Sequence, residues 1–199
     1  MKLNKTLVLI PIIIILVVSL SGCITDDLFK KGETFESNGI TFRYPESWQV
    51  ANSVAEGSVG AVASKENHNI SVVVQQVPSE LGTDIQTACS NNNKNLVLSP
   101  NYINIQETKT TVNNQSVILH RYLVNEADGS QKEHVATWIQ MSDGKLYVLL
   151  FSTPLDNYEA QRSSYDLVVG TFALQGQKQD NGNSIIDGIM EQINKFFSR

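Results

Sequence analysis

The chain opens with an apolar run and continues as short segments of alternating character. Lys2 and Lys5 precede an almost unbroken aliphatic stretch over residues 7–20, which ends in Leu20-Ser21-Gly22-Cys23. A basic start, an apolar stretch and small residues before a cysteine follow the order of a secretory signal. The apolar run is shorter than the ~20 residues that span a bilayer. We therefore predict a cleaved signal over residues 1–22, with an uncleaved membrane anchor as the alternative.

Polar residues without a period follow the signal, and alternating segments begin after them. Residues 23–36 read as a tether between the membrane and the folded part of the chain. Asn38-Gly39 is a turn signal, and β-branched and aromatic residues recur after it. We expect four strands here, over residues 40–44, 48–50, 59–64 and 70–77.

A first helix is predicted over residues 83–96. Thr83 or Asp84 could cap its N-terminus, and apolar residues then recur on one helical face. These residues are Ile85, Ala88, Cys89 and Leu96. Because Cys89 lies on this face, we expect it to be a buried structural residue rather than a nucleophile.

A β meander and a second helix are predicted next. The strands are expected at residues 102–111, 116–125, 133–141 and 145–152, with Asp-Gly pairs in two of the connections. The last two strands are the most apolar, so we place them centrally. The helix that ends near Phe172 carries an inward stripe, while Gln161, Arg162 and Ser164 lie outside it. The stripe comprises Tyr158, Tyr165, Val168, Val169 and Phe172. Strands and helices in this order, joined mostly by hairpins, predict an antiparallel α+β fold for residues 37–174.

The C-terminal segment is predicted to be an amphipathic helix over residues 184–199, reached by a polar linker at 175–183. Ser184 and Asp187 have capping-box spacing. The apolar stripe comprises Ile185, Ile186, Ile189, Ile193, Phe196 and Phe197. We expect this stripe to bind a partner protein or a second copy of the chain. Packing on its own domain and a return to the membrane surface remain alternatives, and the polar face has few basic residues for the latter.

The charge balance excludes nucleic acid as a partner. The chain has 15 basic and 20 acidic residues, a net charge of −5, and removal of the signal would make it about −7. No cluster of Lys or Arg is present to neutralise phosphates. The remaining length fits one domain of ordinary size.

The sequence carries no recognisable catalytic or metal-binding motif. Its histidines, His68, His120 and His134, lack metal-ligand spacing, although His120 and His134 could approach each other if their strands pair. With Cys23 modified, Cys89 would be the one thiol left, so no disulfide is expected. We therefore predict no cofactor, no metal and no enzymatic activity. Sequons at Asn69 and Asn114 leave glycosylation open.

Leu20-Ser21-Gly22-Cys23 resembles the lipobox of prokaryotic lipoproteins, in which the cysteine thiol carries a diacylglyceryl group. Two acyl chains anchor a protein stably. The resemblance implies lipidation at Cys23 and a position on the outer face of the cytoplasmic membrane. The abundance of isoleucine and asparagine suits some methanogenic archaea.

Residues 38–50, with Tyr44-Pro45 followed by Trp48, resemble the opening of PsbP-like domains. The turn at 111–115, the Arg121-Tyr122 strand end, the strand at 145–149 and the helix over 158–172 resemble the same family. This resemblance implies an antiparallel sheet sandwiched between helices, the fold shared by PsbP and the Ran-binding Mog proteins. Within that fold, Tyr44, Pro45 and Trp48 are expected to be structural, with Trp48 packed over the sheet edge against a helix.

The family resemblance implies binding rather than catalysis. In plants PsbP is an extrinsic photosystem subunit that helps retain ions at the manganese cluster. Here no metal or photosystem-docking motif matches, and the C-terminal helix departs from the family, so a photosystem role is not expected. We predict a lipid-anchored, extracytoplasmic adaptor domain that associates with an envelope protein complex. A small-solute or ion-binding lipoprotein is the alternative, and an envelope enzyme is the least favoured.

Overall fold

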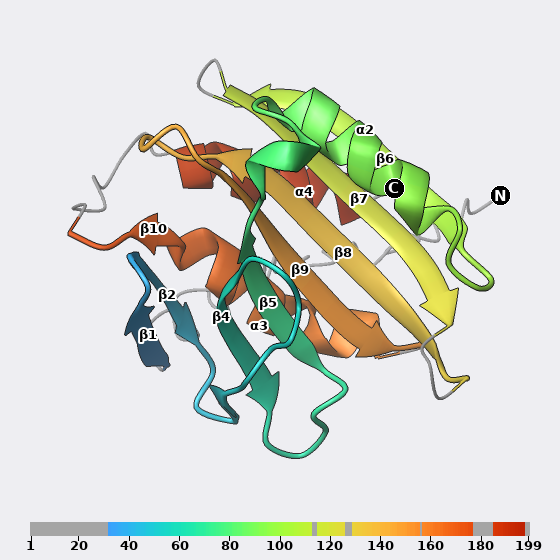
Figure 1. Ribbon diagram of the computed structural model, residues 1–199. Coiled ribbons are helices and arrows are strands. Elements are labelled where there is room, and N and C mark those ends of the chain that lie inside the picture. The colour runs from blue at the N-terminus through green and yellow to red at the C-terminus, as the bar shows by residue number, and fades with distance from the viewer. Residues whose placement is uncertain (1–31, 113–114, 126–128, 156, 177–184, 198–199) are drawn as a thin grey trace, which may run out of the picture.

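A computed structural model describes residues 32–112, 115–125, 129–155, 157–176 and 185–197 (Figure 1). The strands are β1 (Glu33–Ser37), β2 (Ile40–Tyr44), β3 (Trp48–Val50), β4 (Ser58–Ser64), β5 (Ser71–Gln76), β6 (Ile103–Val112), β7 (Gln115–Asn125), β8 (Gln131–Gln140), β9 (Leu146–Pro154) and β10 (Ala173–Leu174). The helices are η1 (Ser79–Leu81), α2 (Ile85–Leu96), α3 (Tyr158–Thr171) and α4 (Ile185–Phe197). These elements form the predicted α+β fold.

The central feature is a seven-stranded antiparallel sheet in the order β3-β4-β5-β9-β8-β7-β6. Strand β9 occupies the middle and β8 lies beside it, which confirms the prediction that the two most apolar segments are central. Leu149 and Phe151 of β9 are fully buried. The connection between β8 and β9 turns at Gly144, whose φ of 79° is the left-handed value that Asp-Gly pairs accept.

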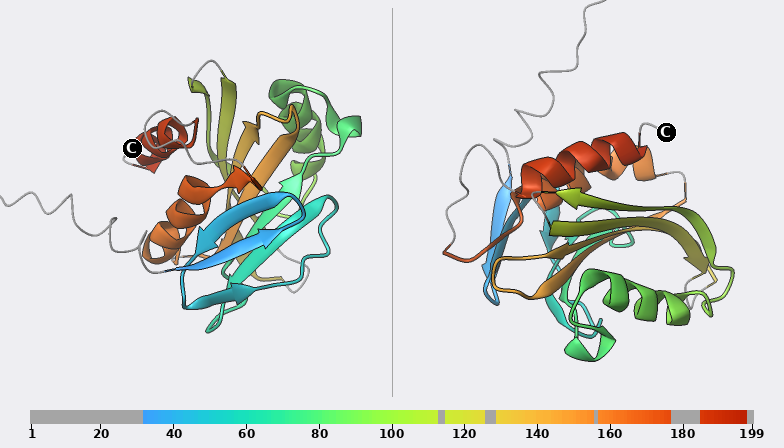
Figure 2. Two further views of the ribbon diagram at one scale, coloured as in Figure 1. Left: turned by 90° about the vertical axis from the view of Figure 1, so that its left-hand side faces the viewer. Right: turned by 90° about the horizontal axis from the view of Figure 1, so that it is seen from above.

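Helices cover both faces of this sheet, as the views in Figure 2 show. Helix α2 packs on one face, which is called the α2 face below, and α3 and α4 pack on the other. The side chain of Asp84 caps α2 by accepting a hydrogen bond from the backbone N–H of Thr87 at 2.9 Å. The predicted stripe of α3 is buried against the sheet.

A second sheet, β1-β2-β10, closes one end of the domain. Residues 33–36, which we placed in the tether, form most of β1. The Asn38-Gly39 pair in the sequence is typical of a two-residue hairpin turn and so indicated a strand before it. In the structure these two residues have φ values of 52° and 79°, as such a turn requires. Phe35 pairs with Phe42 across the hairpin, and their rings stack with centroids 4.7 Å apart. The folded domain therefore begins at Glu33 rather than at residue 37.

Helix α4 packs on its own domain, beside α3 and against β6 and β7. Ile186, Ile189, Ile193 and Phe196 are buried in the core cluster on this face. The stripe that we expected to bind a partner is therefore used within the chain, which was one of the alternatives. The side chain of Ile185, the capping residue Ser184 and most of the linker lie outside the described residues.

The position of α4 also corrects the prediction for α3. Ser164, expected outside the inward stripe, is buried, and Arg162 lies beneath Phe197 of α4, with its guanidinium carbon 5.0 Å from the ring centroid. Arg162 also donates a hydrogen bond to the side-chain oxygen of Asn194 at 2.7 Å. Helix α4 covers a side of α3 that the apolar pattern of α3 alone assigns to solvent.

Candidate binding groove on the α2 face

A groove that combines apolar and polar lining residues lies on the α2 face. Four neighbouring strands, β5, β9, β8 and β7, form its floor, and α2 with η1 forms one wall. Glu56, in the loop between β3 and β4, forms the opposite wall. The cavity has a volume of about 420 Å³, within the range of pockets that bind small molecules or single side chains.

The strand register explains which side chains meet in the groove. Gln75, Val148 and Trp138 lie side by side on β5, β9 and β8, and Leu150 lies beside Ala136 in the next row. Adjacent strands are about 4.8 Å apart, so the floor is roughly 14 Å across from β5 to β7. The groove is therefore long enough for an extended group.

One end of the groove, over β7, is aromatic and neutral. His120 is buried there, and burial lowers the pKa of its imidazole. Its Nε2 lies 3.2 Å from the Tyr102 hydroxyl. Tyr122 lies between His120 and His134, with ring centroids 4.8 Å and 5.1 Å away. The strands of His120 and His134 do pair, but the ring of Tyr122 lies between the two histidines.

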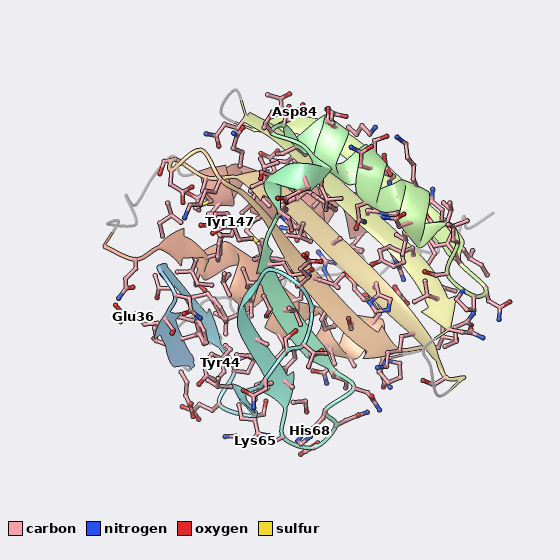
Figure 3. All side chains as sticks on the ribbon, viewed as in Figure 1. Glu36, Tyr44, Lys65, His68, Asp84 and Tyr147 are labelled. Atoms are coloured by element: carbon pink, nitrogen blue, oxygen red, sulfur yellow. The ribbon has the colours of Figure 1, made fainter. Side chains whose placement is uncertain are left out.

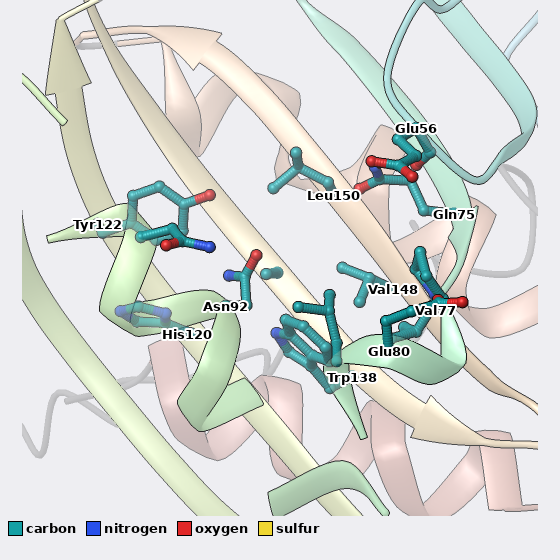
Figure 4. Close-up of a pocket in the computed structure, with 14 residues that line it drawn as sticks. Glu56, Gln75, Val77, Glu80, Asn92, His120, Tyr122, Trp138, Val148 and Leu150 are labelled. Atoms are coloured by element: carbon teal, nitrogen blue, oxygen red, sulfur yellow. The ribbon is translucent and has the colours of Figure 1, made fainter. Parts of the chain in front are cut away.

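The other end of the groove, over β5, is acidic. Glu56 and Glu80 lie at this end, away from His120 and Tyr122 (Figure 4). The side-chain amide of Gln75 donates a hydrogen bond to the backbone carbonyl of Glu56 at 3.0 Å, which fixes the loop beside β5. The groove therefore changes from acidic to neutral along its length.

The remaining candidate residues lie outside the groove. His68 lies in the turn between β4 and β5, at the end of the molecule away from Asp84, with its Nε2 3.2 Å from the Gln49 amide nitrogen (Figure 3). Cys89 is a buried free cysteine, as predicted, and burial raises its pKa to about 11. A thiol with that pKa is not a nucleophile at neutral pH.

Trp48, Tyr44 and Pro45 lie where the first strands join the core. Trp48 is fully buried, and its backbone N–H donates to the carbonyl of Pro45 at 2.9 Å. The Tyr44 hydroxyl donates to the Glu33 carboxylate at 2.8 Å, and burial together with this carboxylate raises the pKa of Tyr44 to about 12. These contacts link β1, β2 and β3 into one packed corner.

Within the described residues, no group of three or more His, Cys, Asp or Glu side chains is placed to hold a metal ion. In the same part of the chain, no helix is both long enough and apolar enough to cross a membrane. Cys23 and Asn114 lie outside the described residues, and Asn69 is exposed in the turn after β4.

Sequence reasoning missed the groove. Its strand residues come from four separate segments, and only the pairing order places them together. Val148, Leu149 and Leu150 form an unbroken apolar run, which is typical of a strand covered on both faces. The face that carries Val148 and Leu150 is only partly covered by a helix. The length of α2 was the available signal, because a 12-residue helix cannot cover a seven-stranded sheet.

Comparison with known proteins gives a family match and a shared fold. The family model described as PsbP matches residues 31–174. The solution structure of cyanobacterial PsbP (CyanoP) from Synechocystis sp. PCC 6803 is similar, with a TM-score of 0.53 and 18% identity, over 72% of this chain and 92% of that one. The Ran-binding protein Mog1p of Saccharomyces cerevisiae has a TM-score of 0.50 and 14% identity, over 72% of this chain and 95% of that one. No curated protein sequence matches significantly.

Proposed function

Because the chain belongs to the PsbP family, we propose that it is a non-catalytic adaptor, held at the outer face of the cytoplasmic membrane by lipid on Cys23. It recruits a protein of the cell envelope through the groove on the α2 face. The observation that carries this proposal is the groove itself, a concave surface floored by four strands and open between α2 and the β3–β4 loop.

The groove replaces α4 as the proposed contact surface. The apolar stripe of α4 is buried against its own domain, so it offers little to a partner without unfolding that contact. The groove, in contrast, combines an apolar floor with polar side chains at its edges, the composition typical of recognition sites. The named partner of Mog1p is Ran, so binding of a protein by this fold has a precedent.

The proposed anchor rests on Leu20-Ser21-Gly22-Cys23 after an apolar run. The first strand begins at Glu33, ten positions after Cys23. A chain of that length spans at most about 35 Å, so the domain stays close to the lipid surface. Mass spectrometry of the N-terminal peptide tests this: a lipid-modified peptide beginning at Cys23 is expected, and an intact peptide beginning at Met1 contradicts the anchor.

Affinity purification of the full chain from native membranes in mild detergent tests the adaptor function. Asn92→Trp places an indole in the groove wall, and Gln86→Trp places the same residue on the exposed side of α2. We expect a partner in stoichiometric yield with the natural chain and with Gln86→Trp, and its loss with Asn92→Trp at an unchanged melting temperature. Equal recovery with both variants would exclude the groove as the contact surface.

A small solute is the second candidate, because a cavity of about 420 Å³ also suits a small ligand. Recovery of the chain alone in every purification, together with a rise in melting temperature with an envelope metabolite extract, would favour this alternative.

A further inference from the structure

We infer that the groove receives a basic side chain, a lysine or arginine presented by the partner, with its charge at the acidic end over β5. This inference rests on the proposed adaptor function and names the chemistry of the contact. Glu56 and Glu80 are the charged residues that line the groove, and neither Lys nor Arg is among its lining residues.

The two carboxylates are available to a ligand. Glu56 and Glu80 are exposed, and neither forms an ion pair within the described part of the chain. They come from different segments, the β3–β4 loop and η1, and the bond from Gln75 to the Glu56 carbonyl holds the loop against β5. A cation between them would interact with both.

The floor of the groove matches the stem of such a side chain. Val148 and Leu150 supply apolar surface beside Trp138 (Figure 4). Lysine and arginine pack their methylene stems on apolar surface and keep the charged group at its edge. An indole face also attracts a cation directly. On the α2 side, the amides of Asn92 and Asn95 can donate to and accept from the partner's backbone.

Other ligand classes fit the groove less well. An anion would meet two carboxylates without a compensating cation, since His120 is buried and neutral at the opposite end. A purely apolar side chain would leave the amides of Asn92 and Asn95 facing it without hydrogen bonds. The net charge of −5 also attracts basic rather than acidic partners.

Three blocked peptides test the charge requirement on the full chain in a non-ionic detergent. They are Ac-Ala-Ala-Lys-Ala-Ala-amide and its norleucine and glutamate counterparts. Norleucine keeps a comparable stem without the charge, and glutamate reverses the charge. The chain has two tryptophans; Trp48 is buried in the core cluster on the other face, so a change in emission reports on Trp138. We expect saturable binding of the lysine peptide, about tenfold weaker binding of the other two, and weakening by salt. Equal binding of the lysine and norleucine peptides would overturn the inference.

Substitution of the acidic end locates the site. Glu56→Gln and Glu80→Gln are each expected to weaken the lysine peptide about fivefold, whereas Glu66→Gln, an exposed change of the same charge in the β4–β5 turn, leaves it unchanged. An equal effect of all three would mean that only the overall charge matters, which contradicts the assigned site.

The outcomes also separate this inference from the adaptor proposal. If the partner is lost with Asn92→Trp but no variant or peptide shows a charge effect, the adaptor function stands and the basic ligand is wrong. If the lysine peptide binds and no partner is recovered, the groove binds cations and the adaptor function is wrong. Butylamine binding as well as the lysine peptide would identify a free amine as the ligand.

Discussion

The hydroxyl of Tyr165 is a buried polar group in an otherwise apolar core. It forms a hydrogen bond with the Thr137 hydroxyl, and the ring stacks on Phe151 with centroids 5.3 Å apart. Thr137 is itself fully buried in the central strand β8. This buried bond ties α3 to the sheet.

Tyr165→Phe should therefore destabilise the domain by about 1–3 kcal/mol, because it leaves the Thr137 hydroxyl buried without that partner. Tyr147→Phe is the matched control, since the Tyr147 hydroxyl donates to Asp143 in a partly buried position, 3.1 Å away. Its loss should cost less than about 1 kcal/mol. Urea unfolding measures both, and equal costs would show that burial of the Thr137 pair is unimportant.

Asp166 on α3 gives the stability a dependence on pH. Burial raises the pKa of this carboxyl from 3.8 to about 6, although Arg162, 3.5 Å away, acts in the opposite direction. A group whose pKa is higher in the folded state contributes stability at pH values below its unfolded pKa. That contribution is lost as the pH rises through about 6.

Asp166→Asn should remove this contribution, so that unfolding free energies measured at about pH 4 and about pH 7 differ less than in the natural chain. The expected reduction is on the order of 2 kcal/mol. Glu66→Gln, at an exposed position, should leave the difference as it is. An unchanged pH dependence in Asp166→Asn would show that the carboxyl stays ionised in the folded protein.

At the scale of elements, α4 is part of the domain core rather than a free arm. Its buried residues contact α3 and the β6–β7 side of the sheet. Phe197 lies between two guanidinium groups, with Arg121 5.7 Å and Arg162 5.0 Å from its ring centroid. Arg121 also forms an ion pair with Glu133, which holds its guanidinium in place beside Phe197.

Ile193→Ala is expected to cost about 2–4 kcal/mol, as for a fully buried aliphatic residue. Asn194→Ala next to it, at an exposed position, should cost less than about 1 kcal/mol. Thermal unfolding compares the two. A negligible effect of Ile193→Ala would mean that α4 leaves the domain in solution, which would return its stripe to a possible partner.

The sequence predicted elements better than contacts between them. Periodicity located α2, α3 and the strands of the large sheet, because each has a clear inward set such as Ile85, Ala88 and Cys89. The same periodicity found the stripe of α4 but could not say what covers it, since an amphipathic helix packs equally well on its own domain or on another. The residues that line the groove beside Trp138 come from separate strands, and the order of those strands in the sheet cannot be read from a local sequence pattern.

At the scale of the whole molecule, the two faces of the sheet have separate tasks. The face under α3 and α4 holds most of the core, and the α2 face holds the groove. Glu80→Gln should therefore weaken lysine-peptide binding without changing the unfolding free energy, and Ile193→Ala should do the reverse.

The double variant Glu80→Gln with Ile193→Ala should show both effects added, within about 0.5 kcal/mol, because distant sites without shared partners act independently. Peptide titration and urea unfolding on the same samples check this. A double variant whose free-energy changes differ clearly from the sum of the single changes would show that the two faces of the sheet are energetically coupled.

Strand β2 pairs with the first and the last strand of the family domain, β1 and β10. It pairs with β1 on one side and with β10 on the other, where Thr41 meets Ala173, and the backbone N–H of Arg43 donates to the Thr171 hydroxyl at 2.8 Å. Contacts so distant along the chain are slow to form. During synthesis, the hairpin that emerges first must wait with one edge unpaired until residue 174 has followed it. The completed three-stranded sheet can therefore form only after almost the whole family domain has been synthesised.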